Sequence, residues 1–296
     1  MRPVHGFIKK IQNIDRNQIK KAAFLRDADV VGFLAWLRQN LASLPVRAKA
    51  IPGAWTGPPQ FGQAHQNYSW RGATWSRTLT SLNGFSVQLS AATKASNQGG
   101  AEKTCLDILQ WGRVPRSGPD LRALAGAGKL TGYLSASRTT LALATADLAL
   151  LGPIGYASSG WTKIYALASC DDLPIYDSRV AAAMAGLVAL YLKSKSQTAV
   201  PPLLNFPVGN FRGDRLVRRP QDMPAAGGYP RFSRLVGSSP LRWASAQIRT
   251  GWILQELAAA SLGEEVERRA PVWPGATMRD IEAGLFVIGY DLRSIL

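Results

Sequence analysis

The chain has 296 residues, of which 46% are hydrophobic and 18% are charged, so it can bury a core and does not have the composition of a disordered protein. Its 35 Lys and Arg against 19 Asp and Glu give a net charge of +16, which favours an anionic partner such as nucleic acid. Two Cys and two His argue against a disulfide framework, a zinc site and a histidine-based catalytic triad. An enzyme of this composition would have to rely on Asp, Glu, Lys, Tyr or Ser.

No segment has the length and apolar composition of a membrane span or a signal peptide. The basic N-terminus lacks an apolar core, and the longest apolar stretch, residues 141–157, is interrupted by Asp147, Gly152 and Pro153. We therefore expect a cytoplasmic protein without a membrane partner, and we expect it to be a monomer.

Apolar residues repeat at helical spacing through much of the chain and predict a mainly α fold. Val30, Leu34, Leu37 and Leu41 mark the first helix, which Pro45 ends. The same spacing, punctuated by Gly and Pro, predicts helices over residues 27–44, 101–112, 119–127, 138–151, 161–170, 177–194, 240–260 and 277–290.

We divide the chain at residue 100. Residues 1–100 are basic and Trp-rich, and because 51–100 have few periodic runs we expect loops and a few strands there. Residues 101–296 form a helical domain that contains a glycine hairpin (152–163) and a Pro- and Arg-rich loop (198–236). Long loops are often functional, and the candidate DNA-binding residues in this one are Arg212, Arg215, Arg218 and Arg219.

The stretch from Gly152 to Met184 has the residue types of a reactive site. It is predicted to form a glycine turn, a short amphipathic helix, an acidic loop and a second helix that begins at Asp177. An Asp at a helix start caps free backbone N–H groups and lies in a favourable dipole field, which is a sufficient structural reason for its presence. A catalytic role for Asp177 therefore needs a further argument.

That argument is a resemblance to the helix-hairpin-helix DNA glycosylases, the superfamily of endonuclease III and 8-oxoguanine glycosylase. Gly152-Pro153-Ile154-Gly155 resembles the glycine hairpin of this family, and Tyr176 to Val180 resembles the segment that carries its invariant Asp. The resemblance is strong over residues 152–184, loose over the helical C-terminal two-thirds, and nearest to the 8-oxoguanine glycosylase-fold branch. It implies a helix-hairpin-helix glycosylase-like fold in which Asp177 is the catalytic carboxylate.

The sequence departs from the family at the lysine that is the nucleophile of bifunctional members. Counting back from Asp177, the family position falls near Ser158 or Ser159, whereas Lys163 lies 14 residues before Asp177. On a helix, Ser159 and Lys163 share a face, so Lys163 is expected to point into the same cleft. Lys163 is therefore the candidate nucleophile, with a phosphate contact as the alternative, and lyase chemistry stays open.

The remaining candidate residues would bind DNA or the flipped base. Hairpin amides suit a phosphate, which makes Gly152, Gly155, Ser159 and Gly160 candidates. Arg179 is expected to contact phosphate or to pair with Asp171 or Asp172. The candidates for an aromatic base pocket are Trp161, Tyr165, Trp111 and Phe286, although aromatic residues at helical spacing are more often core.

We expect double-stranded DNA as the partner, and we expect no cofactor and no catalytic metal. The four-Cys iron–sulfur cluster of endonuclease III cannot form, because the chain has only two Cys. The enzyme would excise a damaged base, or a modified cytosine of phage DNA as an antiviral activity. One alternative is a non-catalytic DNA-binding module that keeps the hairpin but does not require Asp177. Another is an RNA-binding domain that uses the Trp- and Arg-rich residues 51–100.

Overall fold

The fold is mainly helical, as the apolar spacing predicts. The computed structural model describes residues 19–169, 172–209, 216–223, 228–235, 237–258 and 272–296. Within these ranges β-structure is limited to isolated bridges, and the α-helices are, in chain order, α2 (Lys21–Arg26), α3 (Ala28–Asn40), α4 (Trp75–Lys94), α5 (Gln98–Trp111), α6 (Gly118–Gly126), α7 (Leu130–Thr140), α8 (Ser159–Ala168), α9 (Ser178–Ser194), α10 (Pro240–Leu257) and α11 (Met278–Ile288). The 3₁₀ helices are η1 (Ala48–Ala50), η2 (Phe61–Asn67), η3 (Pro115–Ser117), η4 (Pro202–Leu204), η5 (Pro220–Asp222) and η7 (Leu292–Ser294).

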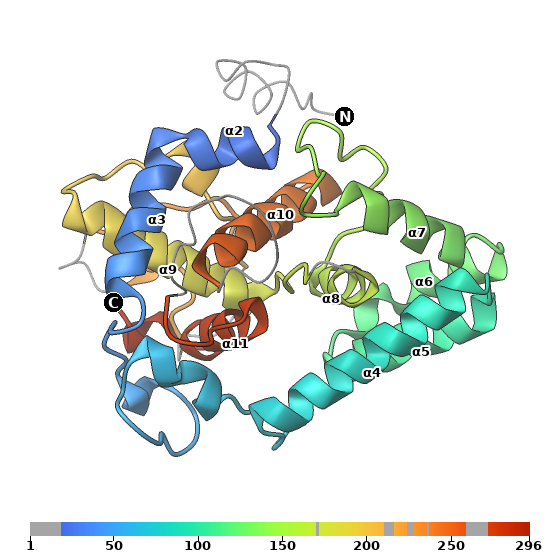
Figure 1. Cartoon of the computed structure of the whole chain (residues 1–296), viewed down its shortest axis with the longest axis horizontal. Coiled ribbons are helices and arrows are strands. Elements are labelled where there is room, and N and C mark those ends of the chain that lie inside the picture. Colours follow the sequence, from blue (N-terminus) through green and yellow to red (C-terminus); the bar gives the residue numbers. More distant parts are fainter. Residues whose placement is uncertain (1–18, 170–171, 210–215, 224–227, 236, 259–271) are drawn as a thin grey trace.

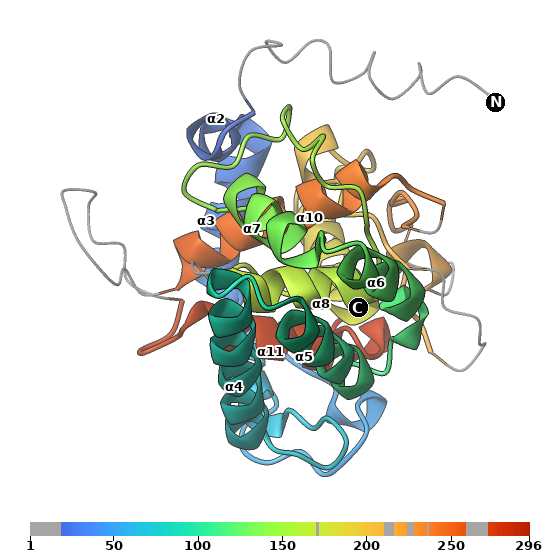
Figure 2. The ribbon, with the colours of Figure 1, turned by 90° about the vertical axis from the view of Figure 1, so that its right-hand side faces the viewer.

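Helix α8 lies between two groups of helices (Figure 1). One group is α4 to α7, and the other contains α2, α3, α9, α10 and α11. Helix α8 contacts α4, α5 and α7 in the first group and α10 in the second. When the molecule is turned by 90°, α4, α5 and α6 face the viewer and α8 lies behind them (Figure 2). Residues on α8 are therefore placed at the boundary between the two groups.

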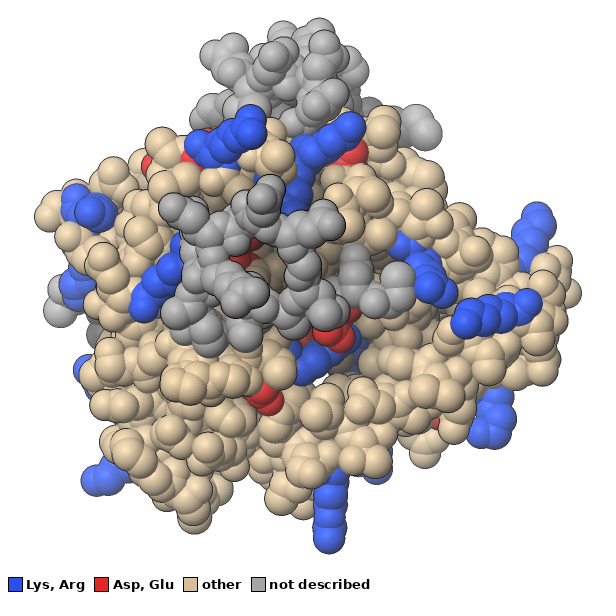
Figure 3. All heavy atoms as spheres, in the orientation of Figure 1, with Lys and Arg blue, Asp and Glu red and all other residues tan. Residues whose placement is uncertain are grey.

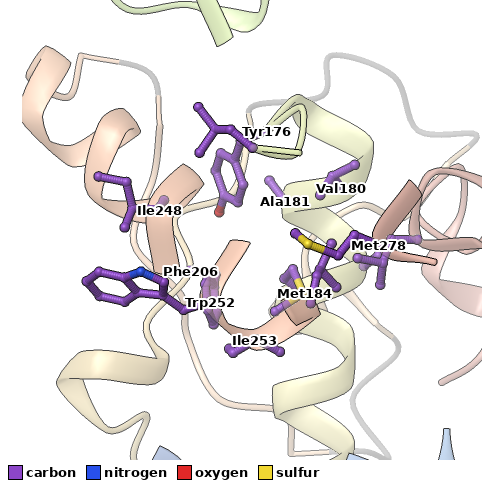
Figure 4. Close-up of a cluster of buried hydrophobic side chains, with 14 of the residues drawn as sticks. Tyr176, Val180, Ala181, Met184, Phe206, Ile248, Trp252, Ile253 and Met278 are labelled. Atoms are coloured by element: carbon purple, nitrogen blue, oxygen red, sulfur yellow. The ribbon is translucent and has the colours of Figure 1, made fainter. Parts of the chain in front are cut away.

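Helix α9 is the central helix of the second group. Of its 17 residues 12 are buried, and a helix that is apolar on every side can only be stable inside a core. Figure 4 shows Val180, Ala181 and Met184 of this helix in one buried cluster with side chains of α10 such as Ile248 and Trp252. The dense packing of α9 therefore fixes the position of its first residues.

Seven predicted helices are confirmed. Helices α3, α5, α6, α8, α9, α10 and α11 each overlap a predicted range. The described parts of the 198–236 loop are irregular apart from η4 and η5. The division at residue 100 stays a prediction, and side chains from both sides of it share one hydrophobic cluster that includes Phe24 and Leu296.

The expectation of strands in residues 51–100 is wrong, because α4 occupies much of this range. Its buried residues Thr78, Leu82, Leu89 and Ala92 follow helical spacing. The pattern is difficult to see in the sequence because polar residues fill the exposed face of the helix, among them Ser76, Thr80 and Ser81.

The predicted helix over 138–151 is also wrong. Helix α7 ends at Thr140, and residues 141–158 reach α8 as an irregular segment. Leu143, Leu151 and Ile154 are buried, so this irregular segment inserts its apolar side chains into the core. The helix-hairpin-helix arrangement stays a prediction, since α8 follows the glycine turn but no helix directly precedes that turn.

One face of the molecule shows more basic than acidic side chains among the described residues. Figure 3 shows Lys and Arg side chains over both groups of helices, with few acidic side chains among them, and a hollow between the groups near the centre of this face. Among the described helices, none combines the length and hydropathy that a bilayer crossing requires.

Close packing of the end of α11 against the start of α9 generates a stability prediction. A Cβ at Gly289 would overlap the carbonyl oxygen of Arg179, whereas a Cβ at Gly84 in α4 would meet nothing within 4 Å. We expect Gly289→Ala to lower the free energy of unfolding by about 3 kcal/mol through this backbone overlap. We expect Gly84→Ala to raise it by about 0.5–1 kcal/mol, because Ala restricts the unfolded chain. Urea unfolding measures both, and equal effects of the two substitutions would contradict the packing.

Candidate active site

The glycine turn before α8 is fixed to the protein by tyrosines. Gly152 and Pro153 occupy a turn that the Ile154 N–H closes by donating to the Leu151 carbonyl at 2.9 Å. Further along, the Tyr165 hydroxyl donates to the Tyr156 carbonyl at 2.7 Å. The rings of Tyr156 and Trp161 stack with their centroids 5.0 Å apart. The turn is therefore held against α8, while Gly152 and Gly155 themselves remain exposed.

Helix α8 begins at a serine cap. The Ser158 Oγ accepts hydrogen bonds from the backbone N–H groups of Gly160 and Trp161. The hydroxyls of Ser158 and Ser117 lie 2.7 Å apart. Because these partners already occupy the first turn, the N–H of Gly160 is satisfied within the protein.

Helix α9 begins at Asp177, whose carboxylate caps it as predicted. Its Oδ1 accepts from the N–H groups of Arg179 at 2.9 Å and Val180 at 3.2 Å. The other oxygen, Oδ2, accepts from the Lys163 Nζ at 3.0 Å. One carboxylate thus joins the start of α9 to the middle of α8.

The Lys163–Asp177 pair is almost entirely buried. The exposed fractions of the two side chains are 5% for Lys163 and 11% for Asp177. Lys163 also donates to the Ser159 carbonyl at 3.3 Å, so the two residues share a helix face as the spacing predicts. A Cβ at Gly112 would lie 2.7 Å from Cδ of Lys163, so the end of α5 leaves room for this side chain only because it carries a glycine.

The surroundings of Asp177 hold it in its charged form. Burial alone would raise the pKa of Asp177, but the Lys163 ammonium and the N–H donors of Arg179 and Val180 outweigh burial and lower it. Glu282 has the opposite balance. Burial raises the pKa of Glu282, and its partners Arg279 and the Ile175 N–H offset this only in part. Of these two buried carboxylates, only Asp177 therefore has a pKa below its ordinary value.

A glutamine of α10 bridges the two segments that carry the pair. The Nε2 of Gln247 donates to the carbonyls of Thr162 at 2.9 Å and Pro174 at 2.8 Å. The Thr162 hydroxyl donates to the Tyr176 carbonyl at 3.0 Å. The bridged residues are neighbours of Lys163 on α8 and of Asp177 on the following extended segment.

Two residues of α11 bridge the same segments from another side. The Glu282 Oε1 accepts from the Ile175 N–H at 3.0 Å. Arg279 pairs with Glu282 at 2.6 Å and donates to the Ala166 carbonyl at 3.4 Å. We call Gln247, Arg279 and Glu282 the bridging residues. Each connects a segment next to Lys163 or Asp177 to α10 or α11, the helices that carry neither of these two residues.

Arg179 lies among aromatic rings beside Asp177. Its Cζ is 4.2 Å from the ring centroid of Phe286, 5.0 Å from that of Tyr290 and 5.2 Å from that of Trp70. The indole N–H of Trp70 donates to the Trp111 carbonyl at 2.9 Å. We call Trp70, Phe286 and Tyr290 the aromatic cluster. Among the residues that the structure describes, Asp172 pairs with Arg279 at 3.8 Å and not with Arg179.

Arg218 lies next to the same cluster. Its Cζ is 5.6 Å from the Tyr290 centroid, and its guanidinium donates to the Tyr290 carbonyl and, at 3.3 Å, to the Ser178 hydroxyl. Burial lowers the pKa values of both arginines, and the charge of Arg179 contributes to the lowering at Arg218. Two half-buried cations, Arg179 of α9 and Arg218 of a neighbouring segment, therefore lie close together at the start of α9.

The structure brings some candidate residues together and separates others. Five candidates lie close together at the start of α9: Lys163, Asp177, Arg179, Phe286 and Arg218. Trp111 contacts this group through Trp70. Trp161 and Tyr165 are 1% and 3% exposed and pack in the core with Tyr133, so neither lines an open pocket. Arg219 pairs with Asp222. Arg212, Arg215 and Asp171 lie outside the described residues.

Five residues at the site were not identified from the sequence: Trp70, Gly112, Gln247, Arg279 and Glu282. Each contacts the site from a position distant in the chain, and Trp70 and Gly112 belong to segments without a motif. Tyr290 shares a helix face with Phe286 in the sequence, which is a signal that could have placed it in the aromatic cluster.

Within the described ranges, no three His, Cys, Asp or Glu side chains gather as metal ligands. No protein-family model, curated protein or solved structure matches this chain. The assignment of a family therefore depends on the residues of the chain itself.

The buried ion pair generates a prediction for stability. Asp177→Asn can keep the helix cap through its amide oxygen but leaves the Lys163 ammonium without a counter-ion. We expect a loss of about 3–5 kcal/mol in the free energy of unfolding. The double variant Lys163→Met/Asp177→Asn should recover most of this loss, because neutral groups of similar volume do not leave a buried charge.

Urea unfolding at several pH values checks this cycle. Because the folded-state pKa of Asp177 is lowered, its contribution is complete above about pH 4, the ordinary aspartate value, and is lost as the pH falls through the lowered folded value. A double variant as unstable as Asp177→Asn would show that the ion pair is not the source of the loss.

The bridging residues generate a prediction for the exposure of Lys163. Glu282→Ala removes the acceptor for the Ile175 N–H, so the segment that carries Asp177 should open more often. We expect reductive methylation of Lys163, measured by mass spectrometry relative to the exposed Lys103, to become about tenfold faster, as local opening allows. Glu282→Gln retains the acceptor and should restore protection.

Two controls separate local opening from general destabilisation. Asp280 lies on the same helix and caps it without touching the bridged segments, so Asp280→Asn should leave Lys163 protected. Cys105 is buried in α5 and should stay unreactive to maleimide in every variant. If Cys105 and Lys163 are exposed together, the bridging residues support the whole fold and not the pair in particular.

Proposed function

We propose that this protein is a DNA glycosylase, in which Asp177 is the catalytic carboxylate. The observation that carries the proposal is the buried Asp177 at the start of α9, whose pKa is lowered and whose carboxylate contacts Lys163 and the N–H of Arg179, the residue that lies against the aromatic cluster. A carboxylate held as an anion in a site of low dielectric can stabilise a developing positive charge far better than one in water.

The reaction that suits this carboxylate is cleavage of an N-glycosidic bond. As the bond from C1′ to the base nitrogen breaks, the bonding electrons leave with the base and positive charge develops on the sugar. Asp177 would stabilise that charge and accept a proton from the attacking water, whose oxygen bonds to C1′. The products are a free base, which takes up a proton, and an abasic deoxyribose.

Lys163 could take either of two roles in this reaction. As an ammonium it keeps Asp177 ionised through their contact at 3.0 Å. As an amine, after transfer of a proton to Asp177, it would attack C1′ in place of water and form a Schiff base when the sugar ring opens. Only the second role leaves a covalent intermediate that borohydride can reduce, so the two are separable by experiment.

The other candidate residues would bind the substrate. Aromatic side chains suit a base that has left the duplex. The candidates are the partly buried Trp111, which contacts Trp70, and Phe286, which contacts Trp70 and Arg179. The exposed Gly152 and Gly155 would present hairpin amides to a phosphate. The net charge of +16 supports DNA as the partner, and we take it to be double-stranded DNA bound by a monomer in the cytoplasm.

One observation favours a second function, a non-catalytic DNA-binding module. The two side chains of the pair are only 5% and 11% exposed, which also suits an ion pair that only stabilises the fold. Such a module would use the same basic surface and would tolerate replacement of Asp177 without loss of DNA affinity.

Base release from defined duplexes tests the proposal. The panel contains 8-oxoguanine, uracil, hypoxanthine, alkylated bases, and hydroxymethylated and glucosylated cytosine. We expect wild type to release at least one of these bases, Asp177→Asn to be slower by about a thousandfold, and Lys163→Ala to abolish borohydride trapping if the lysine is the nucleophile. Tight DNA binding without release of any base by wild type would favour the module.

A further inference from the structure

Among the residues that the structure describes, the guanidinium of Arg179 lies against aromatic rings and donates no hydrogen bond to an acceptor. It lies against all three members of the aromatic cluster, with its Cζ 4.2 Å from the nearest centroid, that of Phe286. Among the described residues it makes no side-chain hydrogen bond and no ion pair within 4.0 Å. A half-buried cation with its N–H donors unused costs free energy unless a ligand supplies acceptors.

The position of Arg179 links it to the reacting atoms. Its backbone N–H donates to Asp177 Oδ1 at 2.9 Å, so its side chain starts two residues from the carboxylate that would face C1′. The base bonded to that C1′ must lie within a few ångströms of the sugar. A base that enters the site can therefore stack on the aromatic cluster and reach the guanidinium at the same time.

Aromatic walls favour a base over a phosphate as the ligand of Arg179. A phosphate would gain nothing from the rings and would lose its water on entering them, whereas a planar base stacks on them. Arg218 provides the contrast. It lies beside Tyr290, donates to the Tyr290 carbonyl and the Ser178 hydroxyl, and suits a backbone phosphate near the start of α9.

From this geometry we infer that Arg179 selects the target base by donating hydrogen bonds to a carbonyl oxygen on the edge of that base. An amino base carries an exocyclic amine in place of this oxygen. A guanidinium is a donor only, so an amine placed opposite it would be repelled and left without a partner. The substrate class is therefore the oxo bases, such as hypoxanthine or uracil, over their amino counterparts adenine and cytosine. This inference rests on the proposed glycosylase function and names the substrate of that site.

Equilibrium binding to uncleavable DNA tests the inference without requiring catalysis. Four duplexes carry hypoxanthine, adenine, uracil or cytosine on a 2′-fluoroarabino sugar, each opposite an abasic analogue so that base pairing does not differ. Fluorescence anisotropy at several salt concentrations gives the affinity and its salt slope for wild type, Arg179→Met and Arg218→Met. Both variants keep an unbranched apolar stem against Tyr290 and remove one guanidinium.

We expect wild type to prefer hypoxanthine over adenine, and uracil over cytosine, by about ten- to a hundredfold, the usual effect of a bidentate contact. Arg179→Met should lose both preferences and keep the slope of log K against log salt. Arg218→Met should keep both preferences and reduce the slope by about one, as the loss of one phosphate contact does.

Three results would overturn the inference: no preference in wild type, a preference for the amino bases, or a uniform loss of affinity in Arg179→Met with a slope reduced by about one. The last would make Arg179 a phosphate contact. Absence of binding to all four duplexes would also count against it. If Arg179→Met does not fold, Arg179→Lys retains the charge and should weaken the preferences with the slope unchanged.

The outcome for Arg179 is distinguishable from the outcome for catalysis. Preferences in binding without base release from cleavable duplexes would remove the glycosylase proposal and leave the selective role of Arg179 intact. Base release with equal binding of oxo and amino bases would do the reverse.

Discussion

The site depends on one interaction, the buried ion pair between Lys163 and Asp177. Taking an ammonium and a carboxylate out of water costs several kcal/mol for each ion, and their attraction compensates only where the geometry is good and the remaining polar atoms have partners. Here Asp177 uses both oxygens, one for the cap of α9 and one for Lys163. The pair therefore constrains how α8 and α9 can lie, and the bridging residues on α10 and α11 serve the same constraint.

The pair also explains why Asp177, at a helix start, is a better candidate for a reactive carboxylate than Glu282. Glu282 is as deeply buried, but its partners do not outweigh the cost of burial and its pKa is raised. Asp177 has the N–H groups of α9 in addition to a cation, and its pKa is lowered. The pKa values of these two buried carboxylates thus shift in opposite directions, and only Asp177 receives the donors of a helix terminus.

The sequence predicts the parts of the site that depend on local rules. Asp177 at the start of α9, and Lys163 on the same face as Ser159, follow from capping and from helical spacing. The prediction of a helix over 138–151 is wrong. Leu143 and Leu151 are buried, but they belong to an irregular segment whose apolar residues happen to have helical spacing. The aromatic cluster also lies beyond local rules, since Trp70 and Phe286 are more than 200 residues apart and meet only through tertiary packing.

The glycine at position 112 has a consequence for sequence variation. It ends α5, in the first group of helices, and its missing Cβ is the space that the stem of Lys163 occupies. A larger residue at 112 would displace the end of the Lys163 side chain, which supplies the cation that Asp177 binds. Positions 112, 163 and 177 should therefore change together or not at all among related sequences, and that triplet is a more specific identifier of relatives than the glycine turn.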